Sequence, residues 1–218
     1  MLTLVGFSAS NYYNVVKLAL LEKGLAFDEQ LAWVGETDLA ASPLGKVPYL
    51  LTEQGPLSES TVILQYLEAR HPEYPLLPRD SFQAAKVSEL LRHLELHLEL
   101  VARNLYPEAF FGGKVSDGLK QKLKPQLQRN IAAFGRLAHF APFIAGESFT
   151  LADCAAAAHL PLVASCTKII YGEDLLTDLP VKDYLKRLAE RPSIQKVSAD
   201  RKTSTEAMMA HLRAKAAA

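Results

Sequence analysis

Hydroxyl side chains gather near the start of the chain, in the stretch Phe7 to Asn14 that reads "FSASNYYN". Ser8, Ser10 and Tyr12 each carry an O–H group that can donate a hydrogen bond to an anion. The stretch leads directly into a helical pattern, and the positive end of a helix dipole also stabilises negative charge. The segment therefore offers candidate electrostatic donors for a reacting anion.

A second candidate site lies in the stretch "SPLGKVPYLLTEQGPLSES", where Pro48 directly precedes a short strand pattern. If the Val47-Pro48 bond is cis, the N–H and C=O of Val47 face outward and can pair with an extended peptide. The residue types alone favour an ordinary trans proline, because only about one X-Pro bond in twenty is cis.

Glu59 and Ser60 stand at the start of the next helical pattern, "STVILQYL". The Ser60 hydroxyl and the first-turn N–H groups can bind a carboxylate, and Glu59 beside them can bind an ammonium group. On residue types alone, an N-cap serine and a first-turn acid are the commoner roles. Lys46 can meet another carboxylate or remain a solvated turn lysine.

These residues require a small α/β unit to bring them together. The pattern predicts a strand over residues 2–7, a helix ending at Gly24, a strand around Phe27, two antiparallel strands around a turn at 53–56, and a helix over 60–71. This order is the layout of a thioredoxin-like domain, which we place at residues 1–76.

The segment "HPEYPLLPRD" contains three prolines in ten residues, which suits an ordered linker. Everything after it has helical patterning, so residues 80–218 are predicted to form an all-helical domain. Its expected elements are a long helix from an Asp80 N-cap to Tyr106, a helix with a kink or boundary at Pro125, a central apolar helix over 149–166, a helix ending near Pro192, and a further short helix.

Composition excludes several classes of protein. The 218 residues are 49% hydrophobic with a formal net charge of +0, and no basic cluster indicates a nucleic-acid partner. No continuous apolar run approaches the roughly 20 residues of a membrane span, and the N-terminus lacks the features of a signal peptide, so we expect a cytoplasmic protein without a membrane partner. Cys154 and Cys166 are expected to be buried thiols without a disulfide.

Three further signals are interpreted as structural. His93 and His97 are four residues apart, but the acidic residue is not placed as in zinc peptidases, so no metal is expected. Thr150 and Asp153 form a capping-box pattern at the start of the apolar helix. His159 within that helix is expected to be a core residue.

Taken in order, "VKLALLEKG", "GKVPYL", "SES" and "SFTLADCAAAA" resemble the cytosolic glutathione transferases of the serine type, theta-like, zeta-like or bacterial. The resemblance covers essentially the whole chain. It implies the glutathione transferase fold, glutathione as co-substrate, a small hydrophobic electrophile as second substrate, a role in detoxification, a homodimer and no metal.

The resemblance also implies roles for individual residues. It favours a cis Val47-Pro48 bond that pairs with glutathione, Lys46 for the glycine-end carboxylate, and Glu59 with Ser60 for the γ-glutamyl group. It places the thiol-activating hydroxyl on Ser10, with Ser8 and Tyr12 as the alternatives. The expected lining of the second-substrate pocket is Tyr12, Tyr106, Phe110 and Phe111, with Tyr13 and Tyr171 as further candidates.

Two other mechanisms of the family fit poorly. Gly6 and Phe7 stand where tyrosine-type enzymes keep their phenol, and no cysteine precedes Cys154, as a cysteine-type enzyme would require. A glutathione-dependent isomerase remains a second enzymatic reading, although "Ser-Ala-Ser-Asn" does not match its usual active turn. A glutathione-binding or protein-interaction module without turnover is the alternative from another class.

Overall fold

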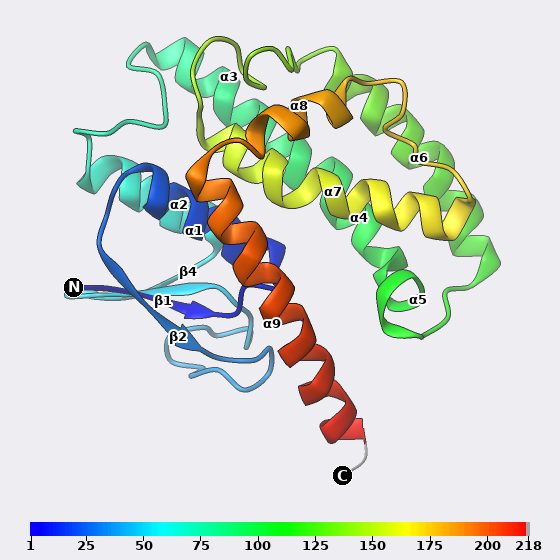
Figure 1. Cartoon of the computed structure of the whole chain (residues 1–218), viewed down its shortest axis with the longest axis horizontal. Coiled ribbons are helices and arrows are strands. Elements are labelled where there is room, and N and C mark those ends of the chain that lie inside the picture. The colour runs from blue at the N-terminus through cyan, green and yellow to red at the C-terminus, as the bar shows by residue number, and fades with distance from the viewer. Residues whose placement is uncertain (217–218) are drawn as a thin grey trace. The chain divides into compact units, whose positions relative to one another are not determined.

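The computed structural model describes residues 1–216 and forms two compact units (Figure 1). The first unit contains Met1–Leu76 together with the segment from Ala189 onward, and the second is Leu77–Leu188. The sequence assigns all of residues 80–218 to the helical domain, whereas the contacts of the last helix group it with the α/β unit.

The first unit is built on a four-stranded sheet of order β2-β1-β3-β4. β1 is parallel to β2 and antiparallel to β3, which is in turn antiparallel to β4. One core cluster joins the sheet to the helices through Leu4, Leu50, Tyr13 and Ile63. The elements are β1 (Leu2–Gly6), α1 (Asn11–Glu22), β2 (Phe27–Leu31), β3 (Tyr49–Thr52), β4 (Gly55–Ser58) and α2 (Ser60–Arg70).

The last helix, α9 (Pro192–Ala216), has 25 residues, so the expectation of a short helix after Pro192 is wrong. It packs against α1 in the opposite direction, because Arg191 just before it pairs with Glu22 while Asp200 pairs with Lys17. Figure 1 shows α9 running alongside the α/β part of the first unit. These polar contacts explain why a segment with a weak apolar pattern forms a long helix.

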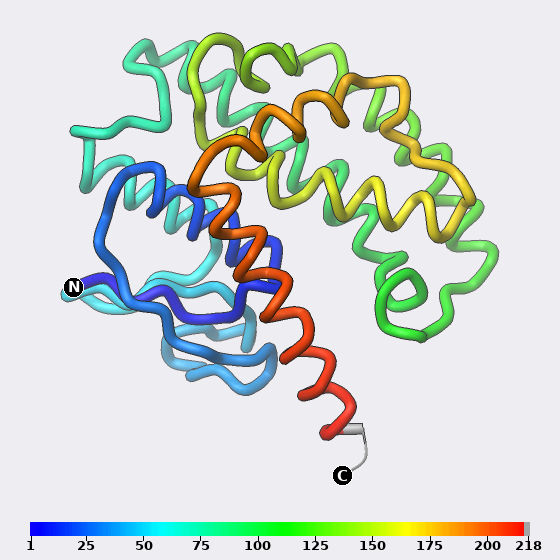
Figure 2. Tube along the Cα trace, in the orientation of Figure 1, coloured from blue at the N-terminus to red at the C-terminus, as the bar shows by residue number. Residues whose placement is uncertain are grey.

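The second unit is helical throughout its regular structure. The predicted long helix is continuous in the trace (Figure 2), but its hydrogen-bond register widens to a π-helix over His93–Glu99 and tightens again over Arg103–Leu105. Pro125 lies inside α6 without ending it. The elements are α3 (Ser81–Arg92), η1 (His93–Glu99), α4 (Leu100–Ala102), η2 (Arg103–Leu105), α5 (Tyr106–Phe111), α6 (Asp117–Gly135), α7 (Leu151–Tyr171) and α8 (Val181–Leu188).

The centre of the second unit is α7, and the predicted capping box at its start is confirmed. Asp153 is fully buried and accepts hydrogen bonds from Thr150, the Ile144 N–H and the Tyr184 hydroxyl. By length and composition α7 is apolar enough to cross a membrane, a test that the core helix of a folded protein also passes, and half of its apolar window is buried inside the structure.

The two cysteines are buried and form no disulfide among the described residues, as the sequence predicts. His159, on the same helix, is also buried and confirms its predicted place in the core.

Candidate functional site

Three segments that carry the candidate residues meet at one end of the sheet of the first unit. Val5 in β1 pairs with Tyr49 in β3, and Tyr49 pairs with Ser58 in β4. The turn Phe7–Ser10 follows β1, the Val47-Pro48 bond precedes β3, and Glu59 follows β4. The register therefore brings the segments containing Ser10, Val47 and Ser60 to the same end of the sheet.

Gly6 allows two of these segments to approach closely. It has φ 146°, and a Cβ at this position would lie 2.7 Å from the Tyr13 ring and 3.1 Å from the Cβ of Val47. A larger residue would push the loop before β3 away from the turn after β1. Glycine here therefore serves the close approach of the two segments as well as the backbone conformation.

The Val47-Pro48 bond is cis, as the resemblance predicts. Pro48 is buried and Val47 half-buried, and among the described residues the N–H and C=O of Val47 have no hydrogen-bond partner. The loop before the bond is fixed by Ser42, whose hydroxyl donates to the Lys46 carbonyl at 2.7 Å and accepts from the Lys46 N–H at 3.2 Å. The Lys46 side chain is exposed.

The junction between β4 and α2 has an unusual backbone. Glu59 has φ 68° and ψ 114°, a conformation that residues with a side chain rarely adopt. Its side chain is exposed, and within the described chain its carboxylate forms no ion pair or hydrogen bond. Ser60, the first residue of α2, is 7% exposed. The junction thus presents a carboxylate beside a hydroxyl and a helix N-terminus.

The turn after β1 ends in Ser10, which is half-buried and caps α1. The Ser10 N–H donates to the Phe7 carbonyl at 3.0 Å, and the Ser10 hydroxyl accepts from the Tyr13 N–H at 3.4 Å. The predicted helix start is therefore confirmed. Tyr12 is also half-buried, whereas Ser8 is buried and its hydroxyl accepts a hydrogen bond from Lys17 at 3.4 Å.

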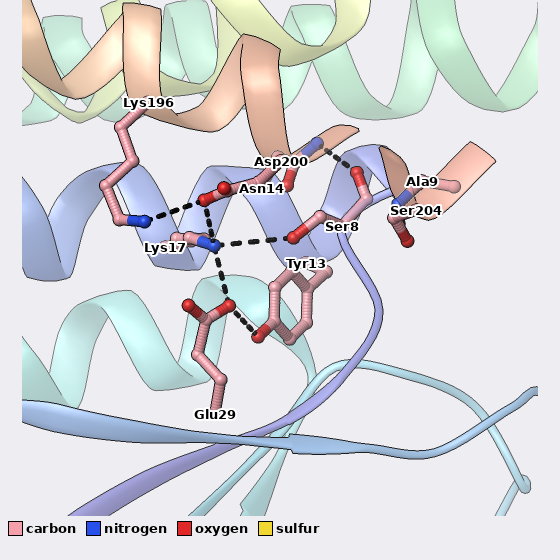
Figure 3. A network of polar contacts seen from close by, with 9 residues as sticks. All are labelled: Ser8, Ala9, Tyr13, Asn14, Lys17, Glu29, Lys196, Asp200 and Ser204. Carbon is pink, nitrogen blue, oxygen red and sulfur yellow. Dashed lines mark hydrogen bonds and ion pairs between the residues drawn. The ribbon is translucent and has the colours of Figure 1, made fainter. Parts of the chain in front are cut away.

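Behind the turn lies a cluster of charged side chains, which we call the Lys17 cluster: Lys17, Glu29, Lys196 and Asp200 (Figure 3). Lys17 is 1% exposed, and its ammonium group lies 2.6 Å from the Glu29 carboxylate and 2.7 Å from that of Asp200. Partial burial raises the pKa of Asp200, but hydrogen bonds from the two lysines outweigh it and hold that pKa below its ordinary value.

Tyr13 also borders this cluster and donates its hydroxyl to Glu29 at 2.6 Å. Burial, followed by this hydrogen bond, raises the pKa of Tyr13 far above that of free tyrosine. Its phenol therefore stays neutral and engaged. The sequence reasoning missed the Lys17 cluster, although a lysine within the apolar run "VVKLAL" is a signal that a buried charge needs partners.

The remaining candidate aromatic residues lie in the second unit. Tyr106 is 6% exposed, and in the described structure its hydroxyl has no hydrogen-bond partner. Its ring meets that of Phe110 edge-on at 5.0 Å, and Phe110 contacts Phe111, which is exposed. Three of the four predicted pocket residues therefore lie together in the second unit, whereas Tyr12 belongs to the first unit.

The metal signal from the two histidines has no structural support in the described residues. The rings of His93 and His97 lie 4.9 Å apart within the π-helix, and burial followed by the nearby His97 lowers the pKa of His93. No group of three or more His, Cys, Asp or Glu residues in the described chain is placed to hold a metal ion.

Comparison with known proteins shows the family to which the chain belongs. The family model "Glutathione S-transferase, N-terminal domain" matches residues 4–75. A glutathione S-transferase of Pseudomonas putida is 45% identical over 216 residues, covering 98% of both chains. A stringent starvation protein A homolog of Pasteurella multocida is 26% identical, covering 88% of this chain and 87% of its own.

Solved structures give the same result for the fold. A glutathione S-transferase from Methylobacterium radiotolerans, in complex with glutathione sulfonate, superimposes with a TM-score of 0.74 at 26% identity, covering 90% of this chain and 93% of the other. Both the thioredoxin-like first domain and the helical second domain predicted from the sequence match this fold. The chain belongs to the cytosolic glutathione S-transferase superfamily.

Proposed function

We propose that the protein conjugates glutathione to small hydrophobic electrophiles, with Ser10 stabilising the glutathione thiolate. One observation carries the proposal: the register of β1, β3 and β4 gathers three segments at one end of the sheet, namely the turn of Ser10, the Val47 main chain, which is unpaired in the described residues, and the Glu59-Ser60 junction. The P. putida relative is named a glutathione S-transferase, and the M. radiotolerans structure contains glutathione sulfonate, an analogue with a sulfonate in place of the thiol.

Each end of glutathione has a partner in this arrangement. The N–H and C=O of Val47 pair with the cysteinyl main chain as an added strand would. The Ser60 hydroxyl and the start of α2 bind the γ-glutamyl carboxylate, and Glu59 binds the ammonium group on the same carbon. The exposed Lys46 meets the glycine-end carboxylate.

Ser10 is suited to donate to the sulfur. As an N-cap it uses an oxygen lone pair to accept from Tyr13, so its hydroxyl proton is available for a thiolate. The free thiol has a pKa of about 8.5, and each pKa unit by which the site lowers it stabilises the thiolate by about 1.4 kcal/mol. Ser8 is a poorer donor to a ligand because it is buried and faces Lys17.

The aromatic residues predicted from the sequence are the candidate contacts of the second substrate. Tyr106, Phe110 and Phe111 provide an aromatic surface in the second unit, and Tyr12 provides one beside Ser10. We extend the proposal to a detoxifying role in the cytoplasm and to a homodimer, as the superfamily resemblance implies.

Conjugation of a generic aryl halide tests the proposal. We expect the wild type to turn over, Ser10→Ala to lose about tenfold or more in kcat with glutathione affinity retained, and Ser10→Thr to keep most of the activity. Ser88→Ala is the matched control and should stay near the wild type, because Ser88 is an exposed serine of α3 whose hydroxyl donates to the Ala84 carbonyl of its own helix. Undiminished activity in Ser10→Ala would move the role to Ser8 or Tyr12.

A binding module without turnover is the alternative, and the stringent starvation protein A homolog gives it some weight because its name is not that of a transferase. A wild type that binds glutathione but conjugates no member of a broad electrophile panel would favour this alternative. A glutathione-dependent isomerase would be recognised in the same panel by isomerisation without consumption of glutathione.

A further inference from the structure

Helix α9 makes a direct hydrogen bond to the turn that carries Ser10. The N–H of Ala9 donates to the hydroxyl of Ser204 at 3.0 Å, across 195 residues of sequence. Ala9 is the residue immediately before Ser10, and Figure 3 shows Ser204 beside it on α9. A side chain from the end of the chain thus holds the main chain of the active turn.

A second connection runs through the Lys17 cluster. Asp200 lies one helical turn before Ser204, so both side chains leave α9 on the same face. Asp200 pairs with Lys17 at 2.7 Å, and Lys17 donates to the Ser8 hydroxyl at 3.4 Å. Asn14 adds a hydrogen bond to the Ser8 carbonyl at 2.8 Å. The two residues that precede Ser10 are therefore fixed from α9 and α1.

The charges around this connection are balanced. The charged groups that face Lys17 are the carboxylates of Glu29 from β2 and Asp200 from α9. The ammonium group of Lys196 also pairs with the Asp200 carboxylate, at 3.0 Å. Tyr13 is neutral and hydrogen-bonded to Glu29. Because the two lysines balance the two carboxylates, the cluster fixes the position of the Phe7–Ser10 turn without adding net charge beside it.

We propose that Ser204 and Asp200 of α9 are positioning residues for thiol activation: they hold the Phe7–Ser10 turn so that the Ser10 hydroxyl points at the sulfur of bound glutathione. The proposal rests on the proposed function. Neither residue touches glutathione in this assignment, since Ser204 acts through the Ala9 main chain and Asp200 through Lys17 and Ser8. A hydroxyl donor must hold its distance and angle to the thiolate, so a looser turn weakens its effect.

The test compares the pH dependence of conjugation in Ser204→Ala with that in Ser204→Thr, which keeps the hydroxyl. Thr205→Ala is the matched control, because the Thr205 hydroxyl is exposed and donates to the Arg201 carbonyl of its own helix. Asp200→Asn is paired with Glu206→Gln, an exposed acid on the same helix. Thiolate absorbance of the glutathione complex reports the pKa of the bound thiol directly.

We expect Ser204→Ala to raise the pKa of the bound thiol by about half a unit to one unit. Below that pKa, kcat/KM for the electrophile then falls about threefold to tenfold, while at high pH it approaches the wild-type value. The KM for glutathione should change by less than about twofold, because the proposed contacts with Val47, Glu59 and Ser60 are untouched. Ser204→Thr restores the profile, Thr205→Ala keeps it, and Asp200→Asn shifts it in the same direction as Ser204→Ala.

Two outcomes would overturn the positioning role. One is a pH profile of Ser204→Ala that superimposes on that of Thr205→Ala. The other is an equal loss at every pH, which indicates less folded enzyme and not a displaced donor. Failure of the proposed function is separate and visible in the wild type, which would then bind glutathione without forming the thiolate.

Discussion

Glu59 combines a strained backbone with an exposed carboxylate, and these two properties can be separated by substitution. Its φ of 68° belongs to a region where a Cβ is unfavourable, and such residues cost about 1–3 kcal/mol each. Glu59→Gly removes the Cβ, whereas Glu59→Ala keeps it, and both remove the carboxylate. Glycine also lowers the free energy of unfolding by about 0.5–1 kcal/mol relative to alanine, because it makes the unfolded chain conformationally freer.

The balance favours glycine at this position. We expect the free energy of unfolding of Glu59→Gly to exceed that of Glu59→Ala by about 1 kcal/mol, measured by urea denaturation. Glu53 serves as the control site, because it is exposed and its φ is not positive. There the order should reverse, with alanine equal to or more stable than glycine.

The affinity for glutathione should depend on whether the Glu59 carboxylate is present and not on the folding stability of the variant. A hydrogen bond to a charged group contributes about 1.5–3 kcal/mol, and solvent exposure of Glu59 reduces this to about 1 kcal/mol, or roughly fivefold in Kd. Calorimetric titration should show the same loss in both variants and a smaller one in Glu59→Gln. Equal stability of the glycine and alanine variants would refute the strain argument, and unweakened binding in both would refute the γ-glutamyl assignment.

Three further predictions concern buried ionisable side chains. Lys17→Met leaves two carboxylates facing each other and should cost about 2–3 kcal/mol in denaturant unfolding, against under about 1 kcal/mol for the exposed Lys196→Met. Asp153→Ala removes the acceptor of four hydrogen bonds and should cost about 3 kcal/mol or more, with the exposed Asp183→Ala as its control; near-equal losses would contradict the capping argument. Burial lowers the pKa of His159 to about 4, so stability should be constant above about pH 6.5 and fall between pH 6.5 and 4, as the unfolded chain alone takes up the proton. An equally steep fall in His159→Gln would show that other groups cause it.

The candidate site could be predicted from the sequence because its parts are local. The Ser10 cap and the start of α2 at Ser60 depend on neighbouring residues, whereas the cis Val47-Pro48 bond was predicted from the family resemblance of the local motif "GKVPYL", and the structure contains all three. The order of strands and helices along the chain followed from the same local patterns, and that order predicted the thioredoxin-like layout. Residue roles in glutathione binding and activation remain predictions.

What the sequence did not reveal depends on distant contacts. The bonds of Asp200 to Lys17 and of Ser204 to Ala9 join positions more than 180 residues apart, and no local pattern marks them. The length of α9 was missed for the same reason, since polar contacts to the first unit support it. The π-helical register over His93–Glu99 leaves the apolar spacing nearly unchanged, so it was not predicted either.

The return of α9 to the first unit has a consequence for biosynthesis. A ribosome releases the strands and α1 first, long before the residues that supply Asp200. Until then Lys17 lacks the carboxylate of Asp200, and the main-chain N–H of Ala9 lacks the Ser204 hydroxyl that accepts its hydrogen bond. The nascent chain can thus collapse early, but the Phe7–Ser10 turn acquires its final geometry only once α9 has been synthesised.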